Sequence, residues 1–512
     1  MPQTITTGYK ALVDAAKAEI EEIEVADAMK LVGRNDVVLV DIRDPRRTCL
    51  SGIRQPRRSR HSLLRCKQSL GTGVMKRQMH LNLFIQSRGH HEAAWRHPAS
   101  TPLALTDIRY YQDVARRAEA ALFDSIFLAD QLALADAAQA GRTWLDPVTV
   151  LGALAVSTSR IGLIVTASTT YTEPFNLTRA FASLDHISNG RIGWNIVTSW
   201  EAAAARNYGG SGQMSHADRY VRGEEFMTVV KQLWDSWSDD AVLDDRAGGF
   251  YARAAGIRPI DHAGAHYRVA GPLNLPRCPQ GRPVLVQAGS SDDGRSFAAR
   301  HAEAVFTAHM EKATAKAFYA DLKARVVAAG RPADQALILP GLSPMIAGTE
   351  KDARRLALDL NELADPEVGR KRLSGRFGGH DFSHLPLDKP LRAEDFPDPG
   401  TVQAARSRTE VIVGLVRREG LTLRQLLARL AGARGHFTFA GTPEQVADLM
   451  QDWHADGAAD GFNIMPPILP AMLDVFAAEV IPLLQRRGLF RTAYTGETLR
   501  AHYGLTRPDC RF

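Results

Sequence analysis

From Met79 onward, apolar segments of strand length alternate with amphipathic stretches of helix length. Between Thr106 and Phe123, for example, Ile108, Tyr111 and Val114 recur at helical spacing. This alternation is typical of a parallel sheet whose strands are joined by helices. The expected strands cover residues 79–85, 125–129, 161–166, 191–197, 283–287, 303–307, 337–347 and 461–465. Eight such strands predict an α/β fold closed into a TIM (β/α)8 barrel.

Polar side chains stand at the carboxyl ends of several of these strands. In a barrel of this type the loops that follow the strands gather at one mouth, where ligands bind. We therefore expect the polar residues of the segment WNIVTS, 194–199, to face a ligand while Ile192, Trp194 and Ile196 pack around them. The polar strand-end positions are Asp130, Thr166, Ser168, Asn195, Thr198, Gln287 and Asn463.

Two segments are long for simple connections between barrel strands. Residues 199–282 contain a predicted helix at 218–237. Residues 370–436 are rich in Gly, Pro and His before a predicted helix at about 420–432. We interpret 370–436 as a lid over the barrel mouth, because long insertions in compact domains often serve that purpose.

Residues 1–74 do not continue the barrel pattern and form an irregular N-terminal extension to the domain at 75–507. Residues 21–47 resemble the opening of a rhodanese-like domain, with a helix, a buried strand at 36–42 and then Pro45. The basic stretch that follows is predicted to be a disordered linker. Cys66 follows the strand too closely for a working sulfurtransferase loop, so we expect a truncated remnant. A basic arm that binds an acidic partner is the alternative.

Charge and cysteine content exclude several classes of function. The net charge of +6 comes from ten Lys and Arg between Pro45 and Arg77, without which the chain is acidic. A nucleic-acid surface on the main body therefore has no support. The four cysteines show no metal-ligand spacing. No apolar run reaches membrane-spanning length and the amino terminus does not resemble a secretory signal, so we expect a cytoplasmic protein.

Several motifs, in order along residues 75–507, resemble those of the bacterial luciferase-like flavin monooxygenases. The similarity is greatest to the branch with nitrilotriacetate, EDTA and dibenzothiophene-sulfone monooxygenases. The motifs include MHLNLFIQSRGHHEAAWRHP, SLDHISNGRIGWNIVTSW, HADRYVRGEEF, GPLNLPRCPQGRPVLVQAGSSDDGR, AGARGHFTFAGTPEQVADLM and DGAADGFNIMPP. No GxGxxG motif follows a strand, which agrees with an enzyme that receives its flavin already reduced.

The resemblance implies a two-component enzyme that takes reduced FMN (FMNH2) from a separate NAD(P)H:flavin reductase. With O2 it would oxygenate a small organic substrate, such as an aminopolycarboxylate, a sulfone or a related xenobiotic. We hypothesise a C4a-(hydro)peroxyflavin as the oxygenating species. A homodimer or homotetramer is expected. The alternatives are a deazaflavin-dependent dehydrogenase of the same superfamily, a hydrolase with paired carboxylates, and a binding role for the basic head.

By resemblance, a set of residues is assigned to the cofactor: Asp130, Thr166, His216, Tyr220, Ser291, Ser290 and Asn195. Each has a simpler interpretation. Asp130 and the two serines could cap helices, and the hydroxyl of Thr166 could satisfy a strand end. His216 and Tyr220, at positions i and i+4, could be a packed pair.

The segment RGHHEAAWRHP places His90, His91, Glu92 and His97 after the first strand. Adjacent histidines point in opposite directions and no HExxH motif is present, so no metal site is expected. His91 is the candidate for a catalytic role near the substrate. Four cations of the predicted lid are available to an anionic chelator, namely Arg370, Lys371, Arg372 and Arg376.

Overall fold

The computed structural model describes residues 77–134, 145–199, 201–209, 214–398, 406–433 and 435–511, together with two short strands, β1 (Glu22–Ile23) and β2 (Leu63–Leu64). The chain divides into two units, Met1–Lys76 and Arg77–Phe512. In the first unit, β1 and β2 pair antiparallel. The rhodanese-like strand predicted at 36–42 and Cys66 lie outside the described residues.

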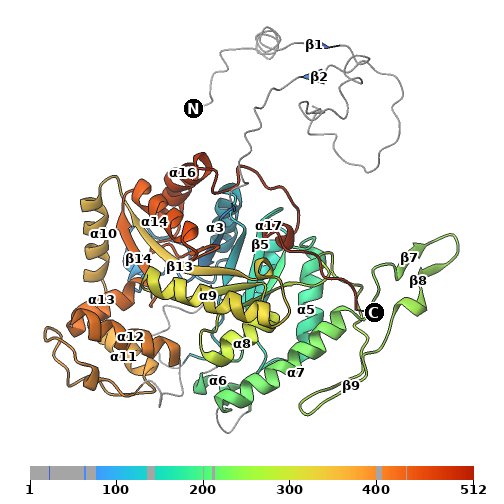
Figure 1. The fold of residues 1–512 in the computed structure, drawn as a ribbon, viewed down its shortest axis with the longest axis horizontal. Helices are drawn as coiled ribbons and strands as arrows, with labels where there is room; N and C mark the ends of the chain where they lie inside the picture. The colour runs from blue at the N-terminus through green and yellow to red at the C-terminus, as the bar shows by residue number, and fades with distance from the viewer. Residues whose placement is uncertain are drawn as a thin grey trace. The chain divides into compact units, whose positions relative to one another are not determined.

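The second unit contains the predicted TIM barrel (Figure 1). Its wall consists of parallel strands that each pair with the next around the ring, and β13 closes the ring by pairing with both β12 and β15. The strands are β3 (His80–Ile85), β4 (Ser125–Leu128), β5 (Gly162–Ser168), β6 (Ile192–Val197), β11 (Val284–Gln287), β12 (Ala304–Thr307), β13 (Leu337–Ile346) and β15 (Gly461–Ile464). The (β/α)8 prediction is confirmed.

Helices cover the outside of this wall. Asp107 caps the first of them by accepting a hydrogen bond from the backbone N–H of Arg109. The helices of the barrel layer are α3 (Ile108–Ala120), α4 (Pro147–Ala155), α5 (Pro174–Ile187), α7 (His216–Trp234), α8 (Asp292–His301), α9 (Lys312–Ala328), α10 (Glu350–Glu362), α14 (Pro443–Ala455), α15 (Ala471–Val475) and α16 (Ile481–Arg486). The helix predicted at 218–237 corresponds to α7.

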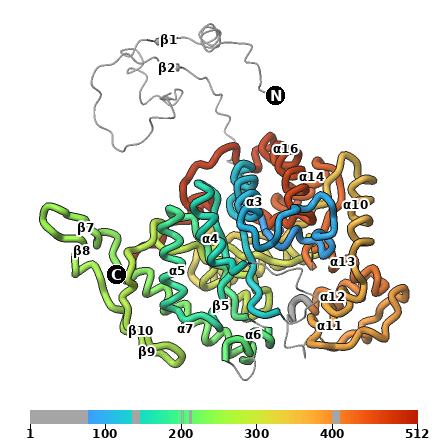
Figure 2. Tube along the Cα trace, turned by 180° about the vertical axis from the view of Figure 1, so that it is seen from behind, coloured from blue at the N-terminus to red at the C-terminus, as the bar shows by residue number. Residues whose placement is uncertain are grey.

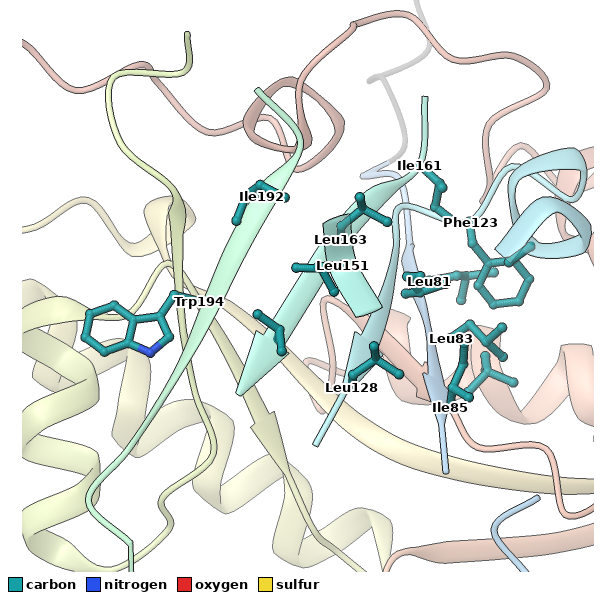
Figure 3. Close-up of a cluster of buried hydrophobic side chains, with 14 of the residues drawn as sticks. Leu81, Leu83, Ile85, Phe123, Leu128, Leu151, Ile161, Leu163, Ile192 and Trp194 are labelled. Carbon is teal, nitrogen blue, oxygen red and sulfur yellow. The ribbon is translucent and has the colours of Figure 1, made fainter. Parts of the chain in front are cut away.

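The strands bury alternate residues on the two faces of the wall. The outward set packs under the helices and includes Leu81, Leu83 and Ile85 of β3 (Figure 3). The inward set forms a separate cluster that includes Phe84, Phe127 and Ile164. Because side chains of a strand alternate between faces, the polar residues Thr166 of β5 and Asn195 of β6 belong to the inward set.

The carboxyl-terminal segment fills the amino end of the barrel. Leu499, in α17 (Leu499–His502), and Tyr503 belong to the inward cluster. A Cβ atom at Gly162 of β5 would lie 2.4 Å from Leu499 Cδ1, so only glycine leaves room for this side chain. The Tyr503 hydroxyl donates to Asn82 Oδ1 at 2.8 Å. With the amino end filled, the carboxyl end is the open mouth of the barrel.

The two long insertions add structure at opposite ends of this unit (Figure 1, Figure 2). The first contributes α6 (Ala202–Asn207) and two projecting hairpins, β7 (Val242–Asp245) with β8 (Phe250–Ala252) and β9 (His262–Ala263) with β10 (Arg268–Val269). The second contributes α11 (Pro366–Arg376), α12 (Arg406–Glu419) and α13 (Leu423–Ala433), whose apolar side chains form a hydrophobic cluster of their own.

Strand β14 was not predicted from the sequence, and neither were the hairpin strands β7 to β10. β14 (Phe437–Gly441) follows α13 and pairs in parallel with the outer half of β13, beside the closed ring. Most of its residues are only half-buried. Of the helices in the part of the chain that the structure describes, none is long and apolar enough to cross a membrane.

Candidate active site at the barrel mouth

Two predicted residues meet inside the wall of the barrel. Thr166 of β5 and Asn195 of β6 are paired in register, and Asn195 Nδ2 donates to Thr166 Oγ1 at 2.8 Å. Both side chains are buried. The other atom of the Asn195 amide, Oδ1, is also buried and has no hydrogen-bond partner among the described residues. A buried amide oxygen without a donor is costly, so this atom is a candidate acceptor for a ligand.

Three further predicted residues meet where helices α7 and α8 begin. Ser291 caps α8, and its Oγ accepts from the backbone N–H of Gly294 at 3.1 Å. Tyr220 of α7 forms side-chain hydrogen bonds with Ser291 and with Thr198. His216, the first residue of α7, lies against Tyr220 with 5.0 Å between ring centroids. The His216 Nε2 atom is 3.2 Å from a carboxylate oxygen of Asp293.

Thr198 connects the Thr166–Asn195 pair with the residues at the starts of α7 and α8. It follows β6 directly, three residues after Asn195, and reaches Tyr220 on the neighbouring helix. Burial raises the pKa of the Tyr220 hydroxyl, so it stays protonated at neutral pH and keeps a proton to donate. The mouth between β5, β6, α7 and α8 is therefore lined by the hydroxyl groups of Thr198, Tyr220 and Ser291 and by the amide oxygen of Asn195.

The turn between β11 and α8 lies close to Tyr220. A Cβ atom at Gly289 would be 2.3 Å from Gln287 Nε2 and 3.2 Å from the Tyr220 hydroxyl. Glycine is thus needed for the close approach of this backbone. Ser290 is partly exposed in the same turn, next to Ser291. This arrangement, backbone amides and hydroxyls before a helix start, is typical of an anion seat.

Asp130 follows β4 on another side of the mouth. Its Oδ1 accepts from the backbone N–H of Gln131 at 2.8 Å, so it does not cap α4. Burial raises the pKa of Asp130 to about 6, and Asp146 adds to the rise. The pKa of Glu201, just before α6, is raised by burial and by Asp130. Carboxyl groups therefore gather at this part of the mouth.

Aromatic rings fill the barrel below the mouth. Phe84 contacts Phe127 with ring centroids 4.6 Å apart and Phe306 with centroids 5.4 Å apart. His436, from the loop before β14, stacks on Phe306 at 4.8 Å and 3° between ring planes. His436 and the phenylalanines are buried. They form a dry floor beneath the polar lining.

His91 lies beside the second insertion. Its Nδ1 accepts from the backbone N–H of Ala93 at 3.1 Å, so Nε2 carries the proton and donates to Asn361 Oδ1 of α10 at 3.1 Å. Burial lowers the pKa of His91. The ring is therefore neutral and holds the loop after β3 against α10. Its catalytic role stays a prediction.

The neighbouring Glu92 connects the same loop to the predicted lid. It forms an ion pair with Arg372 of α11, and both side chains are largely buried. Arg370 donates to the backbone carbonyls of Phe382 and Leu385 at 2.6 and 2.7 Å. Arg370, Arg372 and Arg376, three of the four cations expected to meet an anionic substrate, thus have partners within the protein, whereas Lys371 is exposed.

The sequence analysis overlooked Arg219 of α7. Its side chain is only 4% exposed, and it lies between His216 and Tyr220 along the chain. The motif HADRY could have drawn attention to it, because a residue in the first turn beside two site residues shares their surroundings. No group of three or more His, Cys, Asp or Glu that could hold a metal ion occurs among the residues whose positions are described.

Comparison with known proteins shows the family of this chain. The family model "Luciferase-like monooxygenase" matches residues 79–460. Nitrilotriacetate monooxygenase component A of Aminobacter aminovorans is 47% identical over 84% of this chain and 97% of its own. N-acetyl-S-(2-succino)cysteine monooxygenase of Bacillus subtilis (strain 168) is 44% identical over 85% of this chain and 99% of its own.

A solved structure shares the fold at similar coverage. The EDTA monooxygenase of Chelativorans sp. BNC1 is 36% identical, with a TM-score of 0.69 over 85% of this chain and 100% of that one. Sequence motifs, barrel and relatives agree, and the chain belongs to the bacterial luciferase-like family of flavin-dependent monooxygenases.

Proposed function

We propose that this chain is the oxygenase component of a two-component system that uses FMN. It would receive FMNH2 from a separate NAD(P)H:flavin reductase and transfer one atom of O2 to a small organic substrate. The main support is the lining of the barrel mouth, where the Thr166–Asn195 pair and the Tyr220–Ser291 pair are joined by Thr198. The similarity to a protein named component A supports the two-component arrangement.

The residues at the mouth fit FMN on two observations. The unpaired Asn195 Oδ1 is an acceptor suited to the imide N–H of a flavin ring. The hydroxyls of Tyr220 and Ser291, with the starts of α7 and α8, are suited to a phosphate. We assign Thr166 and Asn195 to the ring, and His216, Tyr220, Ser290 and Ser291 to the phosphate end. Asp130 would border the ring from the β4 side.

Reduced FMN, when bound, would supply the electrons that activate O2. The chain would orient the ring through Asn195 and keep bulk water away from it. The aromatic floor of Phe84, Phe127 and Phe306 excludes water from below. Helices α11–α13 would act as the lid, and the ion pair of Glu92 with Arg372 would hold that lid on the mouth.

For the substrate, we propose a small polycarboxylate. Nitrilotriacetate, EDTA and N-acetyl-S-(2-succino)cysteine appear in the names of the three relatives described above, and each compound carries several carboxyl groups. A polycarboxylate xenobiotic such as nitrilotriacetate is therefore the first compound to test. A homodimer or homotetramer remains part of the proposal.

Oxygen consumption tests this function. The protein, FMN, NADH and a flavin reductase are mixed with or without nitrilotriacetate, and O2 uptake and peroxide release are followed together. We expect added substrate to lower peroxide release per O2 consumed and to incorporate one 18O atom from 18O2 into the product. Substrate oxidation with an oxidised deazaflavin as the hydride acceptor, in the absence of O2, would contradict the proposal and support the dehydrogenase alternative.

A further inference from the structure

Arg219 is a buried cation at the mouth of the barrel. Its Nη1 donates to the Met214 carbonyl oxygen at 3.0 Å, and its Nη2 lies 3.4 Å from His216 Nδ1. Its Nε is buried and has no hydrogen-bond partner within the described ranges. The side chain therefore has one backbone partner and one imidazole, neither of which carries a negative charge.

No carboxylate among the residues that the structure describes forms an ion pair with Arg219. Asp218, the preceding residue, and Asp293, which contacts the same His216, have other partners. Asp218 accepts from the Ser215 hydroxyl at 2.6 Å, and Asp293 faces His216 at 3.2 Å. The ionisable groups that act electrostatically on Arg219 are Tyr220 and Tyr171. Burial raises the pKa of both phenols, so both are neutral at pH 7.

The position of Arg219 adds to the cost of its charge. It lies in the first turn of the 19-residue helix α7, and the N-terminal end of a helix disfavours a cation. Burial also removes water from the guanidinium, and buried charges are stable only when they are paired. Ser291, the N-cap of α8, is hydrogen-bonded to Tyr220, the residue that follows Arg219, so a second helix N-terminus lies close by. A ligand anion would relieve all of these costs.

We propose that Arg219 binds an oxyanion of a bound ligand at the barrel mouth. This inference rests on the proposed function, because Tyr220 and Ser291 are the residues assigned there to FMN. A phosphate and a carboxylate share the required chemistry: each presents oxygen acceptors to the guanidinium fork. The anion is thus either the phosphate of FMN or a carboxylate of the substrate, and a binding experiment separates the two.

The substitution Arg219→Met removes the positive charge and keeps an unbranched side chain. Arg219→Lys keeps a positive charge but lacks the forked guanidinium group. The matched control is Arg222→Met on the same helix, because Arg222 has structural partners, Tyr267 Oη at 2.7 Å and the Thr170 carbonyl oxygen at 3.2 Å. Dissociation constants for FMN and riboflavin are measured by flavin fluorescence, and those for nitrilotriacetate by calorimetry on the FMN-loaded protein. Circular dichroism and thermal midpoints check that each variant folds.

If the anion is the FMN phosphate, Arg219→Met raises the Kd for FMN at least tenfold and leaves that for riboflavin unchanged. If it is a substrate carboxylate, both flavin constants stay unchanged and the Kd for nitrilotriacetate rises at least tenfold. The Kd values of Arg219→Lys lie between those of the wild type and Arg219→Met. The control Arg222→Met does not change the preference for FMN over riboflavin.

Two results would overturn the inference. One is a folded Arg219→Met variant with all three constants unchanged, and the other is equal weakening of FMN and riboflavin, which would make Arg219 a structural support of the loop at Met214. Failure of the proposed function itself would look different, because the wild-type protein would then bind neither flavin.

Discussion

Asn195 and Thr166 lie side by side on neighbouring strands, and the 2.8 Å hydrogen bond from Asn195 Nδ2 to Thr166 Oγ1 fixes the direction in which the amide oxygen points. That oxygen is buried and has no partner among the described residues. With its amino group bonded to the threonine, the asparagine has its amide oxygen left to accept a hydrogen bond.

Thr166→Val is expected to weaken FMN binding and to lower stability. The substitution keeps the shape but leaves the buried Asn195 Nδ2 without its acceptor, which costs about 1–3 kcal/mol of unfolding free energy. A freed amide is also less well oriented, so we expect the Kd for FMN to rise about tenfold, equivalent to about 1.4 kcal/mol. Flavin fluorescence titration and urea unfolding measure the two effects.

The control for this variant is Thr228→Val on the exposed face of α7, where the hydroxyl bonds only to the Glu224 carbonyl oxygen of its own helix. It should leave FMN binding as in the wild type. A folded Thr166→Val protein with unchanged affinity for FMN would show that the Thr166–Asn195 pair does not orient the flavin.

Asp130 makes stability depend on pH in a defined direction. Its pKa is about 6 in the folded protein against an ordinary value of 3.8, mainly because of burial. The folded state therefore holds this proton more tightly than the unfolded chain does. The stability that Asp130 contributes is fully present below about pH 4 and is lost as the pH rises through about 6.

Asp130→Asn removes this dependence. From pH 4 to pH 7 the unfolding free energy of the wild type should fall relative to that of Asp130→Asn. Urea unfolding at each pH measures both values. The exposed Asp334→Asn serves as control and should show no such trend. A difference that stays constant over this range would contradict the raised pKa.

The ion pair between Glu92 and Arg372 should hold the predicted lid on the barrel. Both side chains are largely buried, so removal of one partner leaves a poorly solvated charge. We expect Arg372→Met to lower the unfolding free energy by about 3 kcal/mol, and Glu92→Gln in the same protein to recover part of that loss. With substrate and reductase present, the single variant should also release more peroxide per O2 consumed.

The exposed pair Arg424–Asp388, in the same insertion, is the matched control, and its double-mutant cycle should show no measurable coupling. Additive effects of the Glu92 and Arg372 substitutions would mean that this contact does not hold the lid. Normal coupling of O2 use to product in Arg372→Met would remove the link between the ion pair and water exclusion.

The barrel was predictable because each wall strand is a short, mainly apolar run between helical stretches. Thr166 and Asn195 could be placed at the mouth by the general rule for parallel barrels alone. The strand β14 was not predictable, because its five residues are mostly half-buried and lack a clear pattern of alternation. It is held by pairing with the outer half of β13, which only the folded chain reveals.

Charged residues were the least predictable part of the site. Arg370 and Arg372 were expected to be available to an anionic substrate, but the fold brings them to carbonyl groups and to Glu92, which is far away in the chain. Arg219 resembles any surface arginine of an amphipathic helix, and only its burial distinguishes it. Pairing of charges depends on tertiary contacts, so residue type alone does not show which cation meets a ligand.

The most direct test of the account is an anaerobic titration of the purified protein with FMN in the oxidised and in the dithionite-reduced state. We predict saturable binding of one FMN per chain, tighter in the reduced state and weakened by Ser291→Ala combined with Tyr220→Phe. Absence of binding in both redox states, or binding that these two substitutions leave unchanged, would contradict a flavin site between β5, β6, α7 and α8.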